Sequence, residues 1–298
     1  MEFEIFFKTF FYQRHVFPRP GFALYKTICG VYGIPYDFYN CSADNNWEVD
    51  LMDLKSKICD ETVAILICNP SNPTGSSFSE KHLKDIVEVA EQSGLAVIAD
   101  EIYANMTFSG KKFTYTHQVS DKVPVFSVGG IAKQYLAPGW RLGWFVIHNR
   151  SNRVTAEMRG QLVSMCQRVL GPCGPIQGAL PEILLNTPAS YYTELNSKLE
   201  DAGKTFASEL KGVKGLTPIM PGGAMYLMVT IDMEKFKKSG IKNDMEFCER
   251  MISEQSVFCL PGCAFDFPGS FRIVVTVPKD KIKVATDRIR QFCEDNCE

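Results

Sequence analysis

The residue whose surroundings best fit a chemical role is Lys133, in the segment GIAKQYLAPGWRLG (130–143). Its small neighbours Gly130 and Ala132 leave room for another molecule to approach the amine closely. An amine sheltered in this way can have a lowered pKa and attack a carbonyl group. Arg141, further along the same segment, could offer a rigid bidentate fork to a phosphate. These residue types alone would also fit an ordinary solvated lysine in a loop. A chemical role for Lys133 therefore has to be argued from the pattern of the whole segment.

Two further segments combine polar side chains with turns or strand ends. NPSNPTG (69–75) contains Asn72 and by itself is typical of a Pro/Asn/Gly turn. ADEIY places Asp100 at the end of an apolar run and Tyr103 three residues later. Ligands of open α/β sheets lie beyond the carboxyl ends of the strands, so Asp100 could face one. Its alternative interpretation is a helix N-cap.

A fourth segment, FRIVVT, has Arg272 at the start of a predicted C-terminal strand. An arginine there is ordinarily a solvated charge. It could also bind a planar carboxylate, because the guanidinium group presents two parallel donors.

The four segments together, in this order and spacing, resemble class I aminotransferases of fold-type I, which use pyridoxal 5′-phosphate. The resemblance implies that Lys133 forms the Schiff base with the cofactor and that Arg141 holds its phosphate. It also implies that Asn72 and Tyr103 contact the phenolate oxygen of the cofactor ring, while Asp100 pairs with the ring nitrogen and keeps it protonated.

The same resemblance assigns Arg272 to the α-carboxylate of the substrate. Within the family, the sequence is most similar to the animal tyrosine aminotransferase branch. This branch implies transfer of the amino group of L-tyrosine to 2-oxoglutarate, giving 4-hydroxyphenylpyruvate and glutamate. The supporting segments are VFPRPGFALYKT, NPSNPTGSSFSEKHL, IADEIYANMTFSG, AKQYLAPGWRLGW, QRVLGPC, GGAMYLMV and EQSVFCLPG.

The N-terminus departs from the family pattern. MEFEIFFKTFFYQRH (1–15) matches nothing expected before the PRPGF region, and the usual G-x-x-x-A phosphate-binding segment and ring-stacking aromatic residue are not found. Gly130 stands where many aminotransferases have a phosphate-binding serine, and nearby Ser127 is not expected at the phosphate. We therefore expect an N-terminally truncated member of the family. An inactive fragment, an aminotransferase for alanine or another aromatic amino acid, and a lyase sharing the lysine motif stay open as alternatives.

The elements that must position these residues alternate along the chain from residue 62. Continuous apolar runs predict buried strands at 63–68, 95–100, 123–129 and 141–147. A helix is predicted between the first two strands, with a capping box from Ser77 and Glu80 and a stop at Gly94. The pattern predicts an α/β fold with a mostly parallel sheet flanked by helices.

Beyond this sheet, a long helical region is predicted from about Val154 to Leu210, interrupted around GPCGP (171–175) and TPAS (187–190) and followed by elements of α+β character. The later elements are strands in GGAMYLMVTID and FRIVVTV and helices at 243–255 and 278–294. The predicted organisation is an atypical segment (1–15), a partial large cofactor-binding domain (16–194) and a small C-terminal domain (195–298).

Composition agrees with an ordinary globular chain: 298 residues, 45% hydrophobic, 22% charged and a net charge of −2. Nothing in this balance indicates nucleic acid or a membrane surface as partner. The eleven cysteines form no C-x-x-C pair and the four histidines no zinc spacing, so buried reduced thiols and no metal are expected. We expect a cytoplasmic homodimer that acts on small molecules, without a signal peptide or membrane span.

Overall fold

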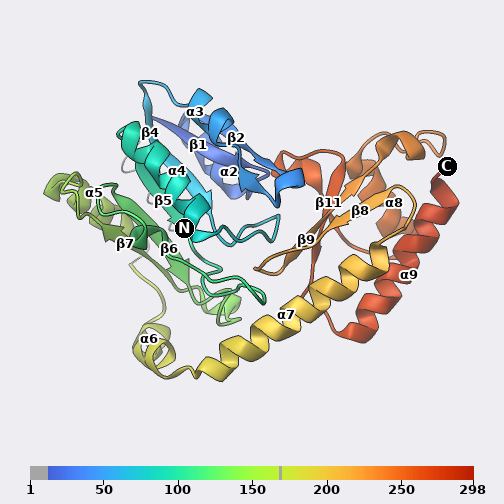
Figure 1. The fold of residues 1–298 in the computed structure, drawn as a ribbon. Coiled ribbons are helices and arrows are strands. Elements are labelled where there is room, and N and C mark those ends of the chain that lie inside the picture. The colour runs from blue at the N-terminus through green and yellow to red at the C-terminus, as the bar shows by residue number, and fades with distance from the viewer. Residues whose placement is uncertain (1–12, 168–169) are drawn as a thin grey trace.

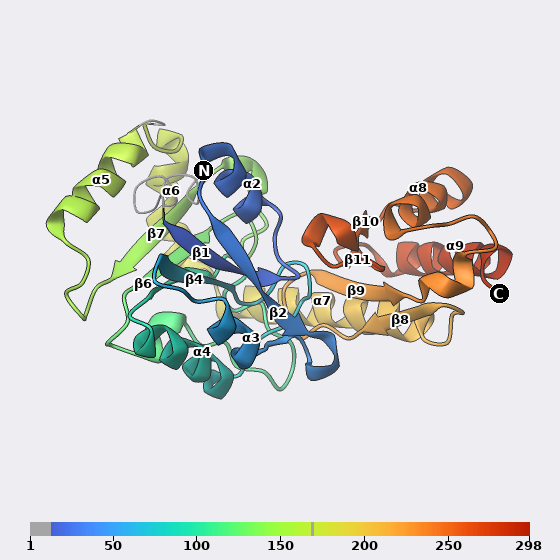
Figure 2. The same cartoon turned by 90° about the horizontal axis from the view of Figure 1, so that it is seen from above.

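The computed structural model describes residues 13–167 and 170–298 (Figure 1). Most of the predicted N-terminal segment 1–15, and two residues of the QRVLGPC motif, lie outside the described residues. Within them, one larger and one smaller sheet are each covered by helices, and the long helix α7 (Ala189–Leu210) runs from the larger part towards the smaller one (Figures 1 and 2).

Seven strands of the described chain form the larger sheet, in the order β3-β2-β1-β4-β5-β6-β7. Their bounds are β1 Arg14–Arg19, β2 Tyr36–Ser42, β3 Glu48–Val49, β4 Thr62–Cys68, β5 Ala96–Asp100, β6 Val125–Gly130 and β7 Gly143–His148. The central strands β2, β1, β4, β5 and β6 are parallel, whereas β3 and β7 pair in antiparallel fashion at the two edges. This confirms the predicted mostly parallel sheet.

Helices cover both faces of the larger sheet because its strands are apolar on both sides. On β4, Ile65 and Ile67 face the core beneath α3 (Leu51–Ser56) and α4 (Glu80–Gln92). Ala64 and Leu66 face the opposite core, where α2 (Leu24–Tyr32) packs. Figure 2 shows these helices on opposite sides of the sheet. Helices therefore pack on both faces of the sheet and support the carboxyl ends of its strands.

The helix predicted after NPSNPTG is present as α4, but its predicted cap is wrong. Ser79, not Ser77, is the N-cap, and its hydroxyl accepts a hydrogen bond from the amide of His82 at 3.1 Å. The chain is still extended at Ser79, so Glu80 is the first helical residue instead of the third position after a cap. Gly94 follows the helix with φ +69°, a left-handed conformation that glycine adopts without strain.

The C-terminal part is built on a four-stranded antiparallel sheet in the order β10-β11-β9-β8. Its strands are β8 Leu216–Ile219, β9 Tyr226–Ile231, β10 Leu260–Pro261 and β11 Ser270–Val274. Helices α7, α8 (Asp244–Gln255) and α9 (Lys279–Asn296) pack on it around buried phenylalanines. Phe247 stacks on Phe271 and contacts Phe236 and Phe292 edge-on, with ring centroids 5.1–5.7 Å apart.

The far edge of the larger sheet is less covered. Strand β7 is mostly half-exposed, in contrast to its fully buried neighbour β6. Helix α5 (Ala156–Cys166) buries only Leu162, and α6 (Gly174–Asn186) buries none of its residues. Two breaks divide the predicted helical region 154–210 into α5, α6 and α7. The predicted domain boundary after residue 194 falls inside α7, and the division stays a prediction.

Two further expectations concern cysteines and membranes. The expectation that the cysteines are buried holds for only five of the eleven: Cys29, Cys68, Cys248, Cys259 and Cys293. Cys59 and Cys173 are exposed, because they lie in a loop and at a helix start instead of in the core. No helix of the described residues is both long and apolar enough to cross a membrane.

Candidate active site

Lys133 lies in the turn that follows β6, beyond the carboxyl edge of the larger sheet. The turn is closed by hydrogen bonds from the amide of Leu136 to the Lys133 carbonyl (3.0 Å) and from Ala137 to Ile131 (3.2 Å). The side chain is half-buried. Its pKa is lowered by burial first, then by the positive charges of Arg272 and Arg141, with Asp100 opposing. The amine is therefore easier to deprotonate than a surface lysine, as the sequence suggested.

Asp100 ends the neighbouring strand β5 and is only 3% exposed. One carboxylate oxygen, Oδ2, accepts a hydrogen bond from the Tyr25 hydroxyl at 2.5 Å, and Oδ1 accepts from the amide of Ile102 at 3.2 Å. Burial raises the pKa of Asp100 to about 6, although both hydrogen bonds and the charge of Lys133 act in the opposite direction. This buried acid has no ion-pair partner in the described residues, so it suits a cationic group brought by a ligand.

Arg272 and Asn72 meet although they are 200 residues apart. The Arg272 guanidinium donates a 2.6 Å hydrogen bond to Oδ1 of Asn72, which leaves the amide nitrogen of Asn72 to donate elsewhere. The guanidinium carbon lies over the rings of Tyr226 at 4.3 Å and Phe265 at 4.7 Å. Arg272 lies in the middle of β11, not at its start as predicted, and is 9% exposed. It is a buried and oriented cation, not a solvated one.

Tyr103 is also buried and joins this group through a second tyrosine. Its hydroxyl forms a 2.7 Å hydrogen bond with the hydroxyl of Tyr226, and the two rings meet edge-on at 5.6 Å. Tyr226 in turn lies under the Arg272 guanidinium. Burial raises the pKa of Tyr103, so the phenol stays neutral and can donate a hydrogen bond.

Arg141 is brought to the site less tightly than the other residues. It follows the short 3-10 turn Pro138–Trp140 and has a left-handed backbone conformation (φ 52°). The side chain is exposed, and its guanidinium donates a 2.9 Å hydrogen bond to the Pro138 carbonyl. It lines an open cavity of about 620 Å³ that Gly130 also borders. A guanidinium beside a wide cavity is suitable for a phosphate, and the charge effect of Arg141 on Lys133 places both near each other.

The glycine at position 130 has a structural reason. A Cβ atom there would lie 3.0 Å from the Leu142 carbonyl oxygen and 3.1 Å from the Cα of Gly143, so even a serine would crowd the β6–β7 hairpin. Ser127 lies in a different, smaller cavity with Glu101 and Gln134, not in the cavity of Arg141. The expectation that Ser127 is not at the phosphate agrees with this placement.

The charges of the site test whether the proposed cofactor fits. The charges of Arg272 and Arg141 both act on Lys133, and the acid Asp100 acts on the same amine. An anionic ligand is needed to balance this excess of positive charge, and a protonated ring nitrogen is needed to pair with the buried acid. Pyridoxal phosphate combines both features with a carbonyl group that an amine can attack. The residues present fit it.

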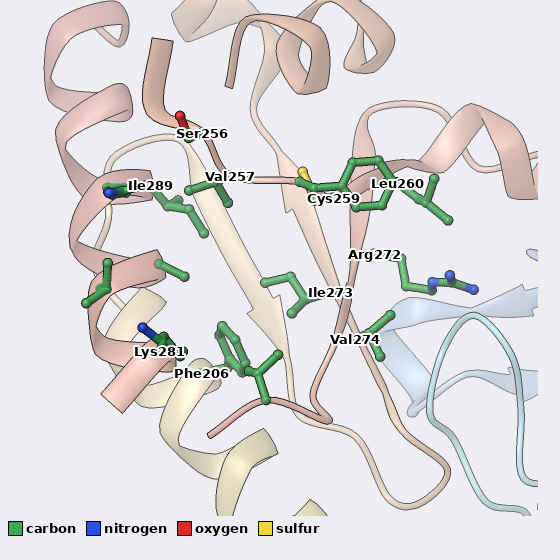
Figure 3. A pocket seen from close by; sticks show the side chains of 15 residues that line it. Phe206, Ser256, Val257, Cys259, Leu260, Arg272, Ile273, Val274, Lys281 and Ile289 are labelled. Atoms are coloured by element: carbon green, nitrogen blue, oxygen red, sulfur yellow. The ribbon is translucent and has the colours of Figure 1, made fainter. Parts of the chain in front are cut away.

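A separate apolar pocket of about 400 Å³ lies between the 256–260 loop, β11 and α9. Figure 3 shows Ile273 directed towards Phe206 and α9, while the neighbouring Arg272 points away towards the larger sheet. Successive side chains of a strand alternate between its faces, so this pocket, which Arg272 also borders, lies on the side of β11 away from the Arg272 guanidinium. It is not part of that site.

Several site residues were missed from the sequence. Tyr25, Tyr226 and Phe265 contact Asp100 or Arg272, yet no role was predicted for them. Tyr25 and Tyr226 lie within the quoted segments VFPRPGFALYKT and GGAMYLMV, where they read as apolar core. A buried tyrosine in an apolar segment still needs a hydrogen-bond partner for its hydroxyl. This requirement could have indicated that Tyr25 and Tyr226 contact polar groups of the site.

Comparison with known proteins agrees with the fold. The larger sheet and the site at its carboxyl edge define the fold-type I aminotransferase architecture. A structure of tyrosine aminotransferase from Leishmania infantum superposes with a TM-score of 0.94 at 31% identity, covering 99% of this chain and 72% of that one. An alanine aminotransferase from Pyrococcus furiosus gives a TM-score of 0.92 at 29% identity, covering 98% and 74%.

The family model for class I and II aminotransferases matches residues 5–289. The chain belongs to this family. It is 45% identical to the tyrosine aminotransferase of Mus musculus and 44% identical to that of Homo sapiens, in each case over 95% of this chain. It spans 62% of the length of each of these two relatives.

Proposed function

We propose that the protein is a pyridoxal-phosphate-dependent aminotransferase that transfers the amino group of L-tyrosine to 2-oxoglutarate. The observation that carries this proposal is the convergence of Lys133, Asp100 and the Asn72–Arg272 pair at one site. The names of the relatives from mouse and human support tyrosine as the amino donor.

Five residues would hold the cofactor. Arg141 would bind its phosphate, Asp100 its ring nitrogen, and Asn72 and Tyr103 its phenolate oxygen, with Lys133 attached to its carbonyl carbon. When bound, pyridoxal phosphate supplies an electron sink for the carbanion formed at the substrate α-carbon. Asp100 keeps this sink effective because a buried carboxylate stabilises the protonated ring nitrogen.

The proton transfers are assigned to Lys133. Its lowered pKa makes the neutral amine more accessible than that of a surface lysine, and the charges of Asp100 and Arg272 both act on it. A neutral amine released from the cofactor can take the substrate α-proton and return it at the neighbouring carbon as general base and general acid.

Substrate orientation is assigned to Arg272. Its bond to Asn72 and the rings of Tyr226 and Phe265 hold the guanidinium plane in place. A fixed guanidinium can bind the α-carboxylate of an amino acid with two parallel hydrogen bonds. Because both substrates carry this carboxylate, the same arginine serves both halves of the cycle.

The test compares the purified chain with Lys133→Ala after addition of pyridoxal phosphate. The wild type is expected to develop the visible absorbance of a Schiff base and to form 4-hydroxyphenylpyruvate from tyrosine and 2-oxoglutarate. Lys133→Ala should show neither, whereas Lys122→Ala, at an exposed lysine paired with Glu91, should behave as wild type. An unchanged band in Lys133→Ala would refute the assignment.

The similarity to the alanine aminotransferase of Pyrococcus furiosus makes alanine the second donor to test, by comparing kcat/KM for tyrosine, phenylalanine and alanine. A family member without catalytic activity is the second candidate function, because α6 and the β7 edge bury few side chains. Absence of turnover in a folded protein that binds the cofactor would favour it.

We also propose a homodimer, in which a second copy covers the exposed β7–α6 face, and a cytoplasmic location, which the five buried thiols in the core support. Sedimentation velocity of the purified chain tests the first proposal and localisation of a tagged chain tests the second. The domain division at residues 194 and 195 is proposed likewise, since the two sheets have separate cores and the buried residues of α7 belong to the C-terminal one.

A further inference from the structure

Tyr25 contacts the acid of the site from an element that the proposed mechanism does not use. It lies in the first turn of α2, is 2% exposed, and donates its hydroxyl hydrogen to Oδ2 of Asp100 at 2.5 Å. Its ring is held by Phe17 at 5.9 Å and by Phe22, edge-on, at 5.6 Å. The hydroxyl therefore has a fixed position relative to the end of β5.

The two hydrogen bonds of Asp100 fall on different oxygens. Tyr25 donates to Oδ2 and the amide of Ile102 to Oδ1. A carboxylate held at one oxygen can still rotate about its Cβ–Cγ bond, whereas one held at both has a defined plane. Of the two donors, only Tyr25 comes from a distant part of the chain, 75 residues away. The plane of the carboxylate therefore depends on how α2 packs on the sheet.

The protonation states favour donation by Tyr25. Burial and the nearby Asp100 raise the pKa of its phenol, so it remains a neutral O–H group over the working pH range. Cys68 is also close, and burial keeps its thiol protonated by raising its pKa. Tyr25 cannot then act as an acceptor from Asp100 unless the acid is itself protonated.

We propose that Tyr25 is a positioning residue that fixes the plane and the charge of the Asp100 carboxylate, so that the carboxylate meets the ring nitrogen of the cofactor. The inference rests on the proposed function only in that Asp100 pairs with that nitrogen. The tyrosine itself needs no contact with the cofactor or the substrate.

The proposal predicts two effects of Tyr25→Phe. Loss of a hydrogen bond to a buried charged group should raise the dissociation constant of pyridoxal phosphate about 10- to 100-fold. It should also move the acid limb of cofactor binding to higher pH, because Asp100 without this donor takes up a proton more readily. The ionisable groups that surround Asp100 in the described chain are Tyr25, Cys68, Glu101, Tyr103, Lys133 and Tyr226.

The chain offers a matched control in Tyr39→Phe. Tyr39 is equally buried, at 0% exposure, and donates a 2.7 Å hydrogen bond, but to the Leu66 carbonyl instead of to Asp100. Both variants lose one buried hydroxyl. If Tyr25 served only stability, the two would lower the unfolding midpoint alike and leave the pH dependence of cofactor binding unchanged.

The experiment measures pyridoxal phosphate binding from pH 5 to pH 9 by Schiff-base absorbance for wild type, Tyr25→Phe and Tyr39→Phe, with unfolding of each apoprotein in urea. We expect weaker binding and a shifted acid limb in Tyr25→Phe alone. In an Asp100→Asn background, Tyr25→Phe should change cofactor affinity by less than twofold. Equal affinity and equal pH midpoints in the two tyrosine variants would overturn the proposal.

Two outcomes are kept apart by the design. A wild type without a Schiff-base band contradicts the proposed function and this inference together, whereas a normal wild type with an unaffected Tyr25→Phe contradicts only the inference. If Tyr25→Phe does not fold, 3-fluorotyrosine at position 25 replaces it. This more acidic phenol is expected to move the acid limb to lower pH, and an unmoved limb overturns the proposal.

Discussion

Asp100→Asn is expected to stabilise the apoprotein at pH 7.5 while weakening its affinity for the cofactor. Burial raises the pKa of Asp100 from 3.8 to about 6, so the folded chain holds this proton more tightly than the unfolded chain does. The contribution of Asp100 to stability is therefore greatest below pH 4, falls as the pH rises towards 6, and stays low above it.

The size of the effect follows from these pKa values. A difference of about two units at about 1.4 kcal/mol each destabilises the folded apoprotein by about 3 kcal/mol at pH 7.5. Asparagine removes the buried charge, but it weakens the hydrogen bond that Tyr25 donates, at a cost of about 1 kcal/mol. A net gain of about 2 kcal/mol at pH 7.5 remains.

The assay is urea unfolding of the apoproteins at pH 4.5 and pH 7.5. The stability difference between Asp100→Asn and wild type should be about 2 kcal/mol at pH 7.5 and should largely disappear at pH 4.5, where the native acid is protonated. Asp60→Asn, at an exposed position, should change stability by less than about 0.5 kcal/mol at both pH values. Asp100→Asn that destabilises the chain equally at both pH values would show that the buried charge is not a source of instability.

Three further changes probe other parts of the site and its support. Arg272→Lys keeps the charge but loses the fork and much of the stacking, so kcat/KM should fall about 10²- to 10³-fold, from about 3–4 kcal/mol of lost interactions. Steady-state kinetics measures this loss. The control is Arg250→Lys, at a distant arginine that is hydrogen-bonded to Asn296, and a similar loss in both variants would contradict the assignment. Gly223→Ala should destabilise the chain by about 1–3 kcal/mol, because the new Cβ would lie 2.5 Å from the Met106 carbonyl oxygen; an unchanged urea midpoint would contradict this. Phe247→Ala should cost about 3–5 kcal/mol by leaving a cavity in the C-terminal core, and calorimetry that finds under 1 kcal/mol would show that the core can close around the change.

The local sequence was sufficient for most of the secondary structure from residue 62 onward, although the short strands β8 and β10 were not predicted. Continuous apolar runs predicted β4, β5 and β6, because strands of a parallel sheet are buried on both faces. The apolar period of 3.6 residues predicted α4, because a helix buries one face. The cap of α4 was misplaced by two residues, since Ser77 and Ser79 have the same chemistry and only the backbone direction distinguishes them. No comparable pattern was recognised for β1 and β2, which supply two of the parallel strands.

The residue types of the site were also available from the sequence, through motifs that resemble a family and imply roles for Lys133, Asp100 and Arg272. What the tertiary structure decided is which other groups meet them. Asn72 reaches Arg272 across 200 residues, and Tyr25 reaches Asp100 from α2, because sheet order and helix packing bring those elements together. Local patterns report which side of an element is buried but not what it is buried against. The partners that set the charge and orientation of the site are therefore defined only in the folded chain.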